Sequence, residues 1–251
     1  MSLHVLHMSP ASWSRRPLLV EPSTPKPVGF EGLLTRGALH EVFSATPADA
    51  LAATCFALAS LKPQRLLWAR QDMAQVELGA PYGPGLSALG FDPSAITLVH
   101  LRDAQSVLQA GLEAARTKGL SSAIIELWGA VRPYDLTASR KLVLAAKASG
   151  VTLCVLNHAA QPAPSAAETR WQVKRLPSRR LPANAPGQTA FNLYLLRHRN
   201  GEAAGQQWSV EWNHERFCFE ERKGFSFAPT ALFKPVVSIP PVRKLRLYKF
   251  A

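Results

Sequence analysis

The stretch that decides the fold is Ser121–Trp128, which reads SSAIIELW. Its centre is apolar from Ala123 to Leu127, except for Glu126. A short, continuous apolar run is typical of a strand between two layers of helices, because both of its faces are then buried. Glu126 stands near the carboxyl end of this strand, the edge at which open α/β sheets bind ligands. The sequence therefore predicts a buried parallel strand whose carboxylate is a candidate site residue.

Strands and helices are predicted to alternate on both sides of this stretch. The strands are expected at 39–43, 64–69, 96–100 and 151–156, and the helices at 50–61, 104–118 and 136–149, with a short helix after 82–89. Asp103 is expected to cap one helix, and either Asp49 or Thr46 another, while Gly119 and Gly150 end two of them. Repeated alternation with short links predicts a right-handed, mostly parallel sheet.

The pattern changes after Thr169. Antiparallel strands are predicted at 171–175, 191–197, 207–212 and 217–220, with a hairpin connection at 198–205. The predicted fold class is therefore α/β, with a mostly parallel sheet flanked by helices and a C-terminal antiparallel hairpin. Residues 1–30 are expected to form an extended arm, 31–220 the folded domain, and 221–251 a basic, proline-containing tail.

The chain of 251 residues is 47% hydrophobic and carries a net charge of +12. Residues 1–169 contain 14 Lys and Arg against 12 Asp and Glu, whereas residues 170–251 contain 15 against 5. This imbalance in the last third favours nucleic acid or an acidic partner. Cys55, Cys154 and Cys218 lack metal-site spacing and are expected to be buried free thiols. Without a leader or a span of ~20 apolar residues, we expect a cytoplasmic protein, with association with the nucleoid left open.

The first strand, turn and helix have the order expected of a P-loop, but not its residues. Ser44–Thr54 contains no Gly to let the backbone wrap phosphates and no Lys to bind them. If the motif begins at Glu41, Ala50 stands in the place of the Lys and Leu51 in the place of the magnesium-binding hydroxyl. Asp49 would repel a phosphate. The sequence therefore predicts that the P-loop is not intact.

The region from Gly90 to His158 resembles the RecA-type ATPase core, because one strand ends in an acid and a later one in a polar pair, Asn157-His158. More closely, the chain resembles the ImuA family of RecA-like proteins. The resemblance rests on GALHEVF (37–43), DLTASRKLVLAAKASGV (135–151), AAETRWQV (166–173), LYLLRHRNG (193–201) and WSVEW (208–212). It covers about residues 30–220 and implies a RecA-like core.

The resemblance implies a non-catalytic accessory protein of translesion synthesis and SOS mutagenesis, induced by DNA damage and binding no cofactor. The implied partner is ImuB, an inactive homologue of Y-family polymerases, with RecA and an error-prone polymerase as further members of this mutasome. In the RecA pattern, Gln71 replaces the activating Glu. The degenerate nucleotide site comprises Ser44, Asp49, Ala50, Leu51, Gln71, Glu126 and Asn157. An active RecA-type ATPase and a division inhibitor related to SulA remain alternatives, and self-association through the arm stays open.

Two basic segments are candidate binding surfaces. The first combines charge with an aromatic ring, as single-stranded DNA prefers, although a solvated face explains it equally well. It comprises Arg170, Trp171, Lys174, Arg175, Arg179 and Arg180. The second, in the tail, alternates basic and apolar residues, as segments that order on a partner do, and a tail lying on its own domain is the alternative. It comprises Lys234, Arg243, Lys244, Leu245, Arg246, Leu247, Tyr248 and Phe250. His40 and Glu41 are not expected to form a catalytic dyad, because adjacent strand residues face opposite ways.

Overall fold

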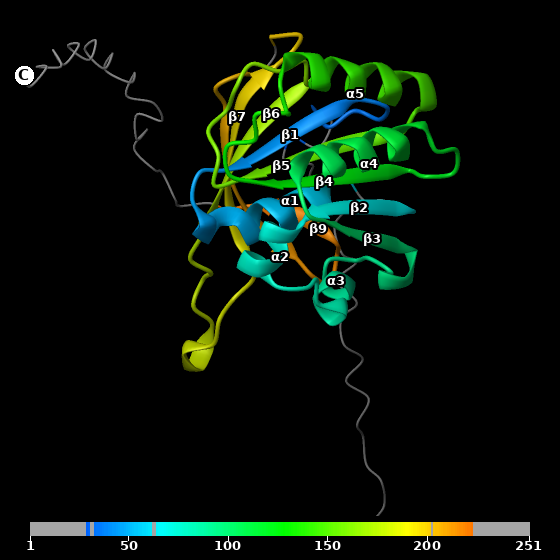
Figure 1. The fold of residues 1–251 in the computed structure, drawn as a ribbon. Coiled ribbons are helices and arrows are strands. Elements are labelled where there is room, and N and C mark those ends of the chain that lie inside the picture. Colours follow the sequence, from blue (N-terminus) through cyan, green and yellow to red (C-terminus); the bar gives the residue numbers. More distant parts are fainter. Residues whose placement is uncertain (1–28, 31–32, 62–63, 202, 223–251) are drawn as a thin grey trace, which may run out of the picture.

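The computed structural model describes residues 29–30, 33–61, 64–201 and 203–222. In this part of the chain, one sheet of nine strands runs in the order β3-β2-β4-β5-β1-β6-β7-β8-β9 (Figure 1). The strands are β1 Leu39–Ser44, β2 Leu66–Gln71, β3 Ile96–Leu101, β4 Ser122–Trp128, β5 Thr152–His158, β6 Thr169–Leu176, β7 Ala190–His198, β8 Gln207–Asn213 and β9 Cys218–Glu221. The helices are α1 Ala50–Leu61, α2 Asp72–Leu78, α3 Gly83–Ala88, α4 Ala104–Arg116 and α5 Leu136–Ser149. The predicted α/β class is confirmed.

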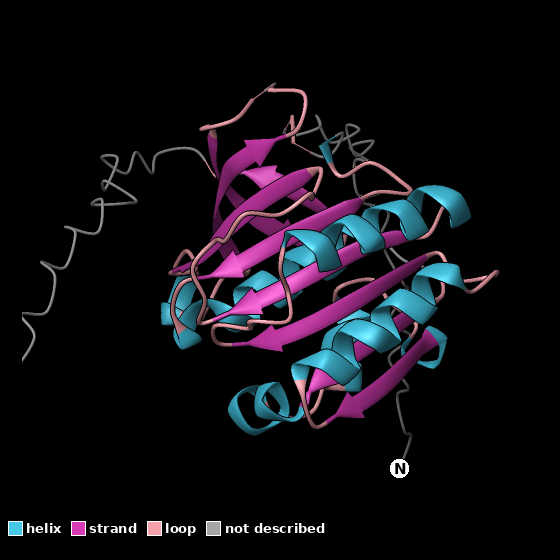
Figure 2. Cartoon of the chain, turned by 45° about the horizontal axis from the view of Figure 1, so that its top comes forward, coloured by secondary structure: helices cyan, strands magenta, loops and turns pink. Residues whose placement is uncertain are grey.

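β4 is the buried parallel strand that the sequence predicted. It pairs in parallel with β2 on one side and β5 on the other. Ile124 packs in the core that includes Phe56 of α1, whereas Ile125 and Leu127 pack in the core beneath α4 and α5. Figure 2 shows α4 and α5 side by side across one face of the sheet. The strand is apolar on both faces because a helical layer covers each of them.

β6 is the turning point of the sheet. It pairs in parallel with β1 and antiparallel with β7, and its register shifts between Arg170 and Trp171. The prediction of an antiparallel strand at 171–175 was therefore half wrong. The residues of a strand indicate which side chains are buried, but they do not indicate the direction of the neighbouring strands. Here a loop without a helix connects β5 to β6 and places β6 beside β1, in parallel. β7, β8 and β9 then follow antiparallel, as expected.

Several element ends differ from the prediction. β2 runs to Gln71 instead of ending at residue 69, and α2, which follows it directly, was not predicted. Asp103 caps α4 through the backbone N–H of Ser106, as expected, but α4 ends at Arg116. Thr46 stands at the N-cap of the 3₁₀ turn Pro47–Asp49 that leads into α1, but its side chain makes no capping hydrogen bond. The Asp49 carboxylate accepts the Thr46 hydroxyl and the backbone N–H of Arg175 instead. The Asp49 carboxylate, which the local sequence predicts to cap α1, therefore binds the backbone of β6 instead.

The expected limits of the folded domain are slightly too narrow. Phe30, which was placed in the arm, is 0% exposed in the core. β9 ends at Glu221, and the buried Arg222 pairs with Glu211 of β8 at 3.1 Å. Cys55, Cys154 and Cys218 are free thiols. Cys154 is fully buried, as expected, whereas Cys55 and Cys218 are only half-buried. Burial raises the pKa of Cys55 to about 11.

Gly111 lets α4 approach β4 closely. A Cβ at this position would lie 2.3 Å from Cδ1 and 2.4 Å from Cγ1 of Ile125. Gly→Ala in a helix normally stabilises by up to about 1 kcal/mol, but overpacking costs about 1–3 kcal/mol. We therefore expect Gly111→Ala to lower the free energy of unfolding by about 1 kcal/mol in urea titrations. Gly85→Ala, whose Cβ would make an ordinary 3.5 Å contact, is the control and should not destabilise; equal behaviour of the two variants would contradict this account.

Candidate functional site

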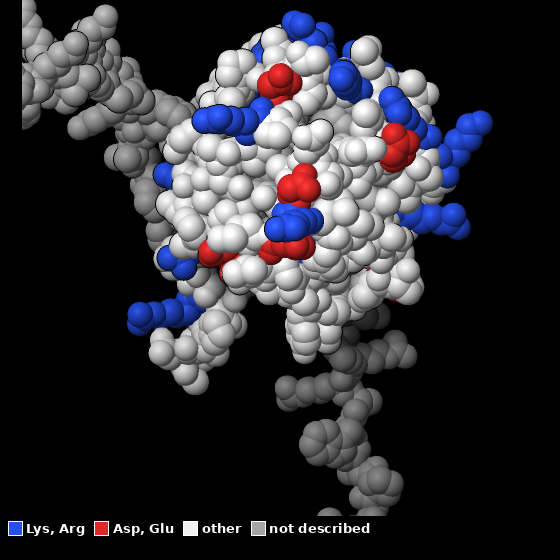
Figure 3. All heavy atoms as spheres, in the orientation of Figure 1, with Lys and Arg blue, Asp and Glu red and all other residues white. Residues whose placement is uncertain are grey.

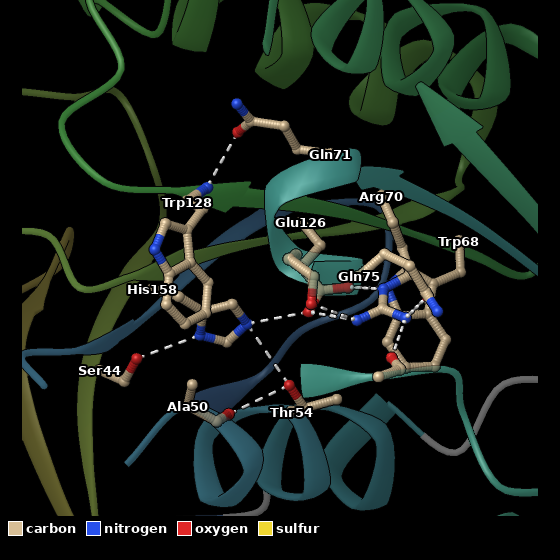
Figure 4. A network of polar contacts seen from close by, with 12 residues as sticks. Ser44, Ala50, Thr54, Trp68, Arg70, Gln71, Gln75, Glu126, Trp128 and His158 are labelled. Atoms are coloured by element: carbon tan, nitrogen blue, oxygen red, sulfur yellow. Dashed lines mark hydrogen bonds and ion pairs between the residues drawn. The ribbon is translucent and has the colours of Figure 1, made fainter. Parts of the chain in front are cut away.

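A buried polar network lies at the carboxyl ends of β2, β4 and β5, on the α1 side of the sheet (Figure 4). Its centre is Glu126, which is fully buried. Glu126 Oε2 accepts hydrogen bonds from Arg70 Nε at 2.5 Å and from Trp68 Nε1 at 2.8 Å. Glu126 Oε1 lies 3.1 Å from His158 Nε2. Both carboxylate oxygens are thus engaged by groups of the protein itself.

His158 carries the network across to the first strand and to α1. Its Nδ1 lies 3.1 Å from Ser44 Oγ, and its Nε2 lies 3.5 Å from Thr54 Oγ1. The Thr54 hydroxyl donates in turn to the carbonyl of Ala50 at 3.1 Å. The chain of contacts therefore joins β1, β4, β5 and α1 without a ligand.

Arg70 is the cation of this network, and its guanidinium is held on every side. Its Nη1 donates to Gln75 Oε1 and to the carbonyl of Gly79, both at 2.9 Å, and its Nη2 donates to the carbonyl of Ala74 at 3.2 Å. The side chain is only 2% exposed. Helix α2 and the residue that follows it supply these acceptors. A buried charge is tolerated when it is paired and fully hydrogen-bonded, as here.

The network sets the charge state of Glu126. Burial by itself would raise the pKa of Glu126. The hydrogen bond from His158, the charge of His158 and the Arg70 guanidinium together hold this pKa below its ordinary value of 4.5. The carboxylate is therefore ionised at neutral pH and forms a buried ion pair with Arg70.

The other predicted residues of the nucleotide site are not brought into this network as ligands. Ala50 contributes only a carbonyl, and the side chain of Leu51 is 62% exposed. Gln71 Oε1 accepts the backbone N–H of Trp128 at 3.0 Å, while the Asn157 Nδ2 is buried without a hydrogen-bond partner. Ala50 and Leu51 have no polar side-chain group for a phosphate or Mg²⁺, and both Glu126 oxygens are already engaged, so these positions do not supply the ligands of a magnesium–nucleotide complex. No group of three metal-ligating side chains occurs among the described residues.

Arg70 and His158 were the parts of this network that sequence reasoning missed or undervalued. Arg70 was placed beyond the end of its strand, and His158 was interpreted only as part of a polar pair. A signal existed: β2 and β4 pair so that Arg70 lies beside Glu126. Because a buried charge is costly unless it is paired, a charged residue at the end of one buried strand indicates an opposite charge at the end of the neighbouring strand.

A second buried ion pair lies on the opposite face of the sheet. Glu41 accepts hydrogen bonds from Tyr134 Oη at 2.5 Å and from Arg170 Nε at 2.6 Å, and Arg170 also donates to the carbonyl of Ala163. Burial, followed by the charge of Glu41, raises the pKa of Tyr134. The ring nitrogens of His40 lie 2.8 Å from Thr169 Oγ1 and 2.9 Å from the carbonyl of Thr35. No His40–Glu41 dyad forms, as expected.

The structure corrects the proposed DNA-binding cluster. Trp171 is 0% exposed and packs in the core, so its ring cannot stack on a base. Arg170 is held by Glu41, as described above. Arg175, Arg179 and Arg180 are exposed, and Arg179 pairs with Glu211 at 3.0 Å. The cluster is therefore reduced to these arginines and the half-buried Lys174. The predicted partner-binding tail, 234–250, lies outside the described residues.

The strand order, the helices on both faces and the antiparallel closing strands define a RecA-like fold. Among solved structures, the chain is similar to the RadB recombinase, with a TM-score of 0.51 and 13% sequence identity over 76% of this chain and 93% of that one. At this identity the likeness shows the fold alone. No model of a known protein family matches the sequence, and no curated protein matches it. Within the described ranges, no helix has the length and apolar character to cross a membrane.

Proposed function

We propose that this protein is a non-catalytic, RecA-like accessory protein of DNA-damage-induced translesion synthesis, acting as a scaffold beside an ImuB-like polymerase homologue. One observation carries the non-catalytic part: Arg70, Glu126, His158 and Ser44 are bonded to one another at the edge where a RecA-type enzyme would use such groups on a nucleotide. Catalysis of phosphoryl transfer is almost entirely positioning and electrostatics, and these charges already neutralise each other.

The translesion role is supported by the resemblance to the ImuA family and by the basic last third of the chain. An ImuB-like protein is the proposed main partner, with RecA and an error-prone polymerase as further partners. The SulA-related alternative predicts a tubulin-like partner. A tagged full-length chain recovered from DNA-damaged cells should therefore bring down a polymerase-like protein. Recovery of a tubulin-like protein alone would overturn the proposal, and loss of the partner on deletion of 229–251 would assign its docking to the tail.

Nucleotide titration tests the non-catalytic part. We expect no magnesium-dependent ATP affinity in the micromolar range by calorimetry, and no ATP turnover, because the Lys and the hydroxyl of a P-loop are replaced by Ala50 and Leu51. Turnover that disappears in folded Glu126→Gln protein would instead identify an active ATPase, and circular dichroism would check that the variant is folded.

Direct DNA binding by the exposed arginines is a separate prediction. Arg179→Glu together with Arg180→Glu is expected to reduce retention of the protein on single-stranded DNA and to flatten its salt dependence, because fewer counterions are then released. The matched control reverses two other exposed charges at the end of α4, Arg116→Glu and Lys118→Glu. Equal retention of the wild type and the arginine variant would leave a solvated face as the explanation.

A further inference from the structure

Two cavities lie beside α4 and α5. Figures 1 and 2 show these two helices side by side on the face of the sheet away from α1. One cavity of about 420 Å³ lies between the middle of α4 and the first turns of α5, and Leu108, Leu112 and Leu142 line it. A second, of about 470 Å³, lies towards the ends of both helices, beside Leu144. Lys141 lines both cavities, so they are neighbours along the two helices, and together they are called the α4–α5 groove.

Apolar side chains contribute most of the lining surface of the first cavity, although Gln105, Gln109 and Thr137 also line it. Leu108 and Leu142 are buried, whereas Leu112 is half-buried. Besides Leu142, α5 contributes the small side chains of Ala138 to the first cavity and of Ala145 and Ala148 to the second, which leave room for another backbone to approach. Leu144, at the rim, is 68% exposed. A large apolar side chain left in water beside a cavity is typical of an interaction surface.

The rim of the groove is basic. Arg116, Lys118 and Lys141 line it, and within the described residues Lys118 and Lys141 make no ion pair. The nearby acids are already engaged: Glu113 pairs with Arg116 at 3.0 Å, and the Asp135 carboxylate accepts the backbone N–H of Ala138 at 2.7 Å. In Figure 3, drawn in the orientation of Figure 1, the surface at the upper right is largely white, with more blue than red groups around it.

We infer that the α4–α5 groove binds an acidic, amphipathic helix of another protein. The groove follows helices of 13 and 14 residues, a length of about 20 Å, which suits a partner helix of about four turns. Apolar residues at i, i+3/i+4 and i+7 would fill the two cavities, and flanking carboxylates would face Lys141 and Lys118. The charge of the chain's own terminal segments argues against their binding in this groove. Residues 223–251 contain six Lys and Arg and no acidic residue, and residues 1–28 contain three Lys and Arg and one acidic residue.

Site-specific crosslinking tests this inference whatever partner the proposed function requires. A photoreactive amino acid is placed at Leu144 of the full chain in the cells that produce it, and at the exposed Thr97 of β3 as the control position. Crosslinked peptides are then sequenced by mass spectrometry. We expect peptides of another protein that are acidic and carry apolar residues at helical spacing, enriched over those from position 97.

Two substitutions on one helix make the test specific. Lys141→Glu should lower the crosslinking yield at Leu144 by about tenfold, because a like charge would face the acidic helix. Lys147→Glu makes the same charge change at an exposed position of α5 that lines neither cavity, and it should leave the yield unchanged. The inference is overturned by peptides from this same chain, by neutral or basic peptides, by no enrichment over position 97, or by equal effects of the two lysine changes.

Discussion

Glu126→Gln is expected to lower the free energy of unfolding by about 3–5 kcal/mol, the cost of removing one partner of a buried ion pair. The amide has nearly the shape of the carboxylate but no charge, so the Arg70 guanidinium would remain buried and uncompensated. Its NH₂ group would also face donors, since Arg70 Nε, Trp68 Nε1 and His158 Nε2 all point to the two carboxylate oxygens. Urea titration followed by both fluorescence and circular dichroism would measure the loss.

Glu113→Gln is the matched control for this prediction. Glu113 forms an ion pair with Arg116 at 3.0 Å, but both side chains are largely exposed. Exposed pairs of this kind contribute at most about 1 kcal/mol. A loss for Glu126→Gln as small as that for Glu113→Gln would mean that Arg70 finds water or another acceptor, and that its buried charge does not depend on Glu126.

The Glu126 carboxylate should also make the free energy of unfolding depend on pH. Because the folded-state pKa of Glu126 is held below 4.5, its ionised form is bound more tightly in the folded than in the unfolded state. This contribution is fully present above the unfolded-state pKa of about 4.5 and is lost as the pH falls through the lower folded-state value. The wild type should therefore lose stability below about pH 4.5 more steeply than Glu126→Gln does.

The parallel half of the fold could be predicted because its signals are local. Helices α1 and α5 have the predicted bounds, since the apolar pattern of each lies within neighbouring positions and Gly150 ends α5 as expected. The β4 strand was evident from its continuous apolar run. Where a partner lies far away in sequence, prediction failed: Asp49 binds the backbone of Arg175, and β6 takes its direction from β1.

The place of the candidate site at the carboxyl end of β4 could be predicted, but the side chains that bind Glu126 could not. The missing Gly and Lys are readable directly from Ser44–Thr54. The buried polar network depends on the ion pair between Arg70 and Glu126, which are 56 residues apart in sequence. The register between β2 and β4 places these two residues side by side. For Trp171 the sequence predicted a binding role that the structure does not support. A Trp among basic residues suggests a stacking surface, but the ring of Trp171 is buried in the core. Charge and aromatic composition alone do not distinguish an exposed strand face from a buried one.

Phe30→Ala is expected to lower the free energy of unfolding by about 3–5 kcal/mol, as for other fully buried Phe residues. The Phe30 ring lies 5.9 Å from that of Phe56 in α1, 6.0 Å from that of Trp171 in β6, and 5.3 Å from that of Phe219 in β9. It therefore joins the helix after the first strand to the last strand of the sheet. Losing it would leave a cavity among aromatic rings that cannot move together to fill it, and the closing antiparallel strands should loosen first.

The measurement is a urea titration with hydrogen exchange of the β8 and β9 amides as a second readout. Phe217→Ala is the matched control, because Phe217 precedes β9 but its side chain is 46% exposed, and its loss should be less than half as large. If Phe30→Ala were as mild as Phe217→Ala, the folded domain would begin after residue 30, as the sequence alone suggested, and the aromatic cluster would hold without it. A large loss with faster exchange in β9 would instead show that Phe30, which the sequence assigns to the arm, holds the antiparallel strands against α1.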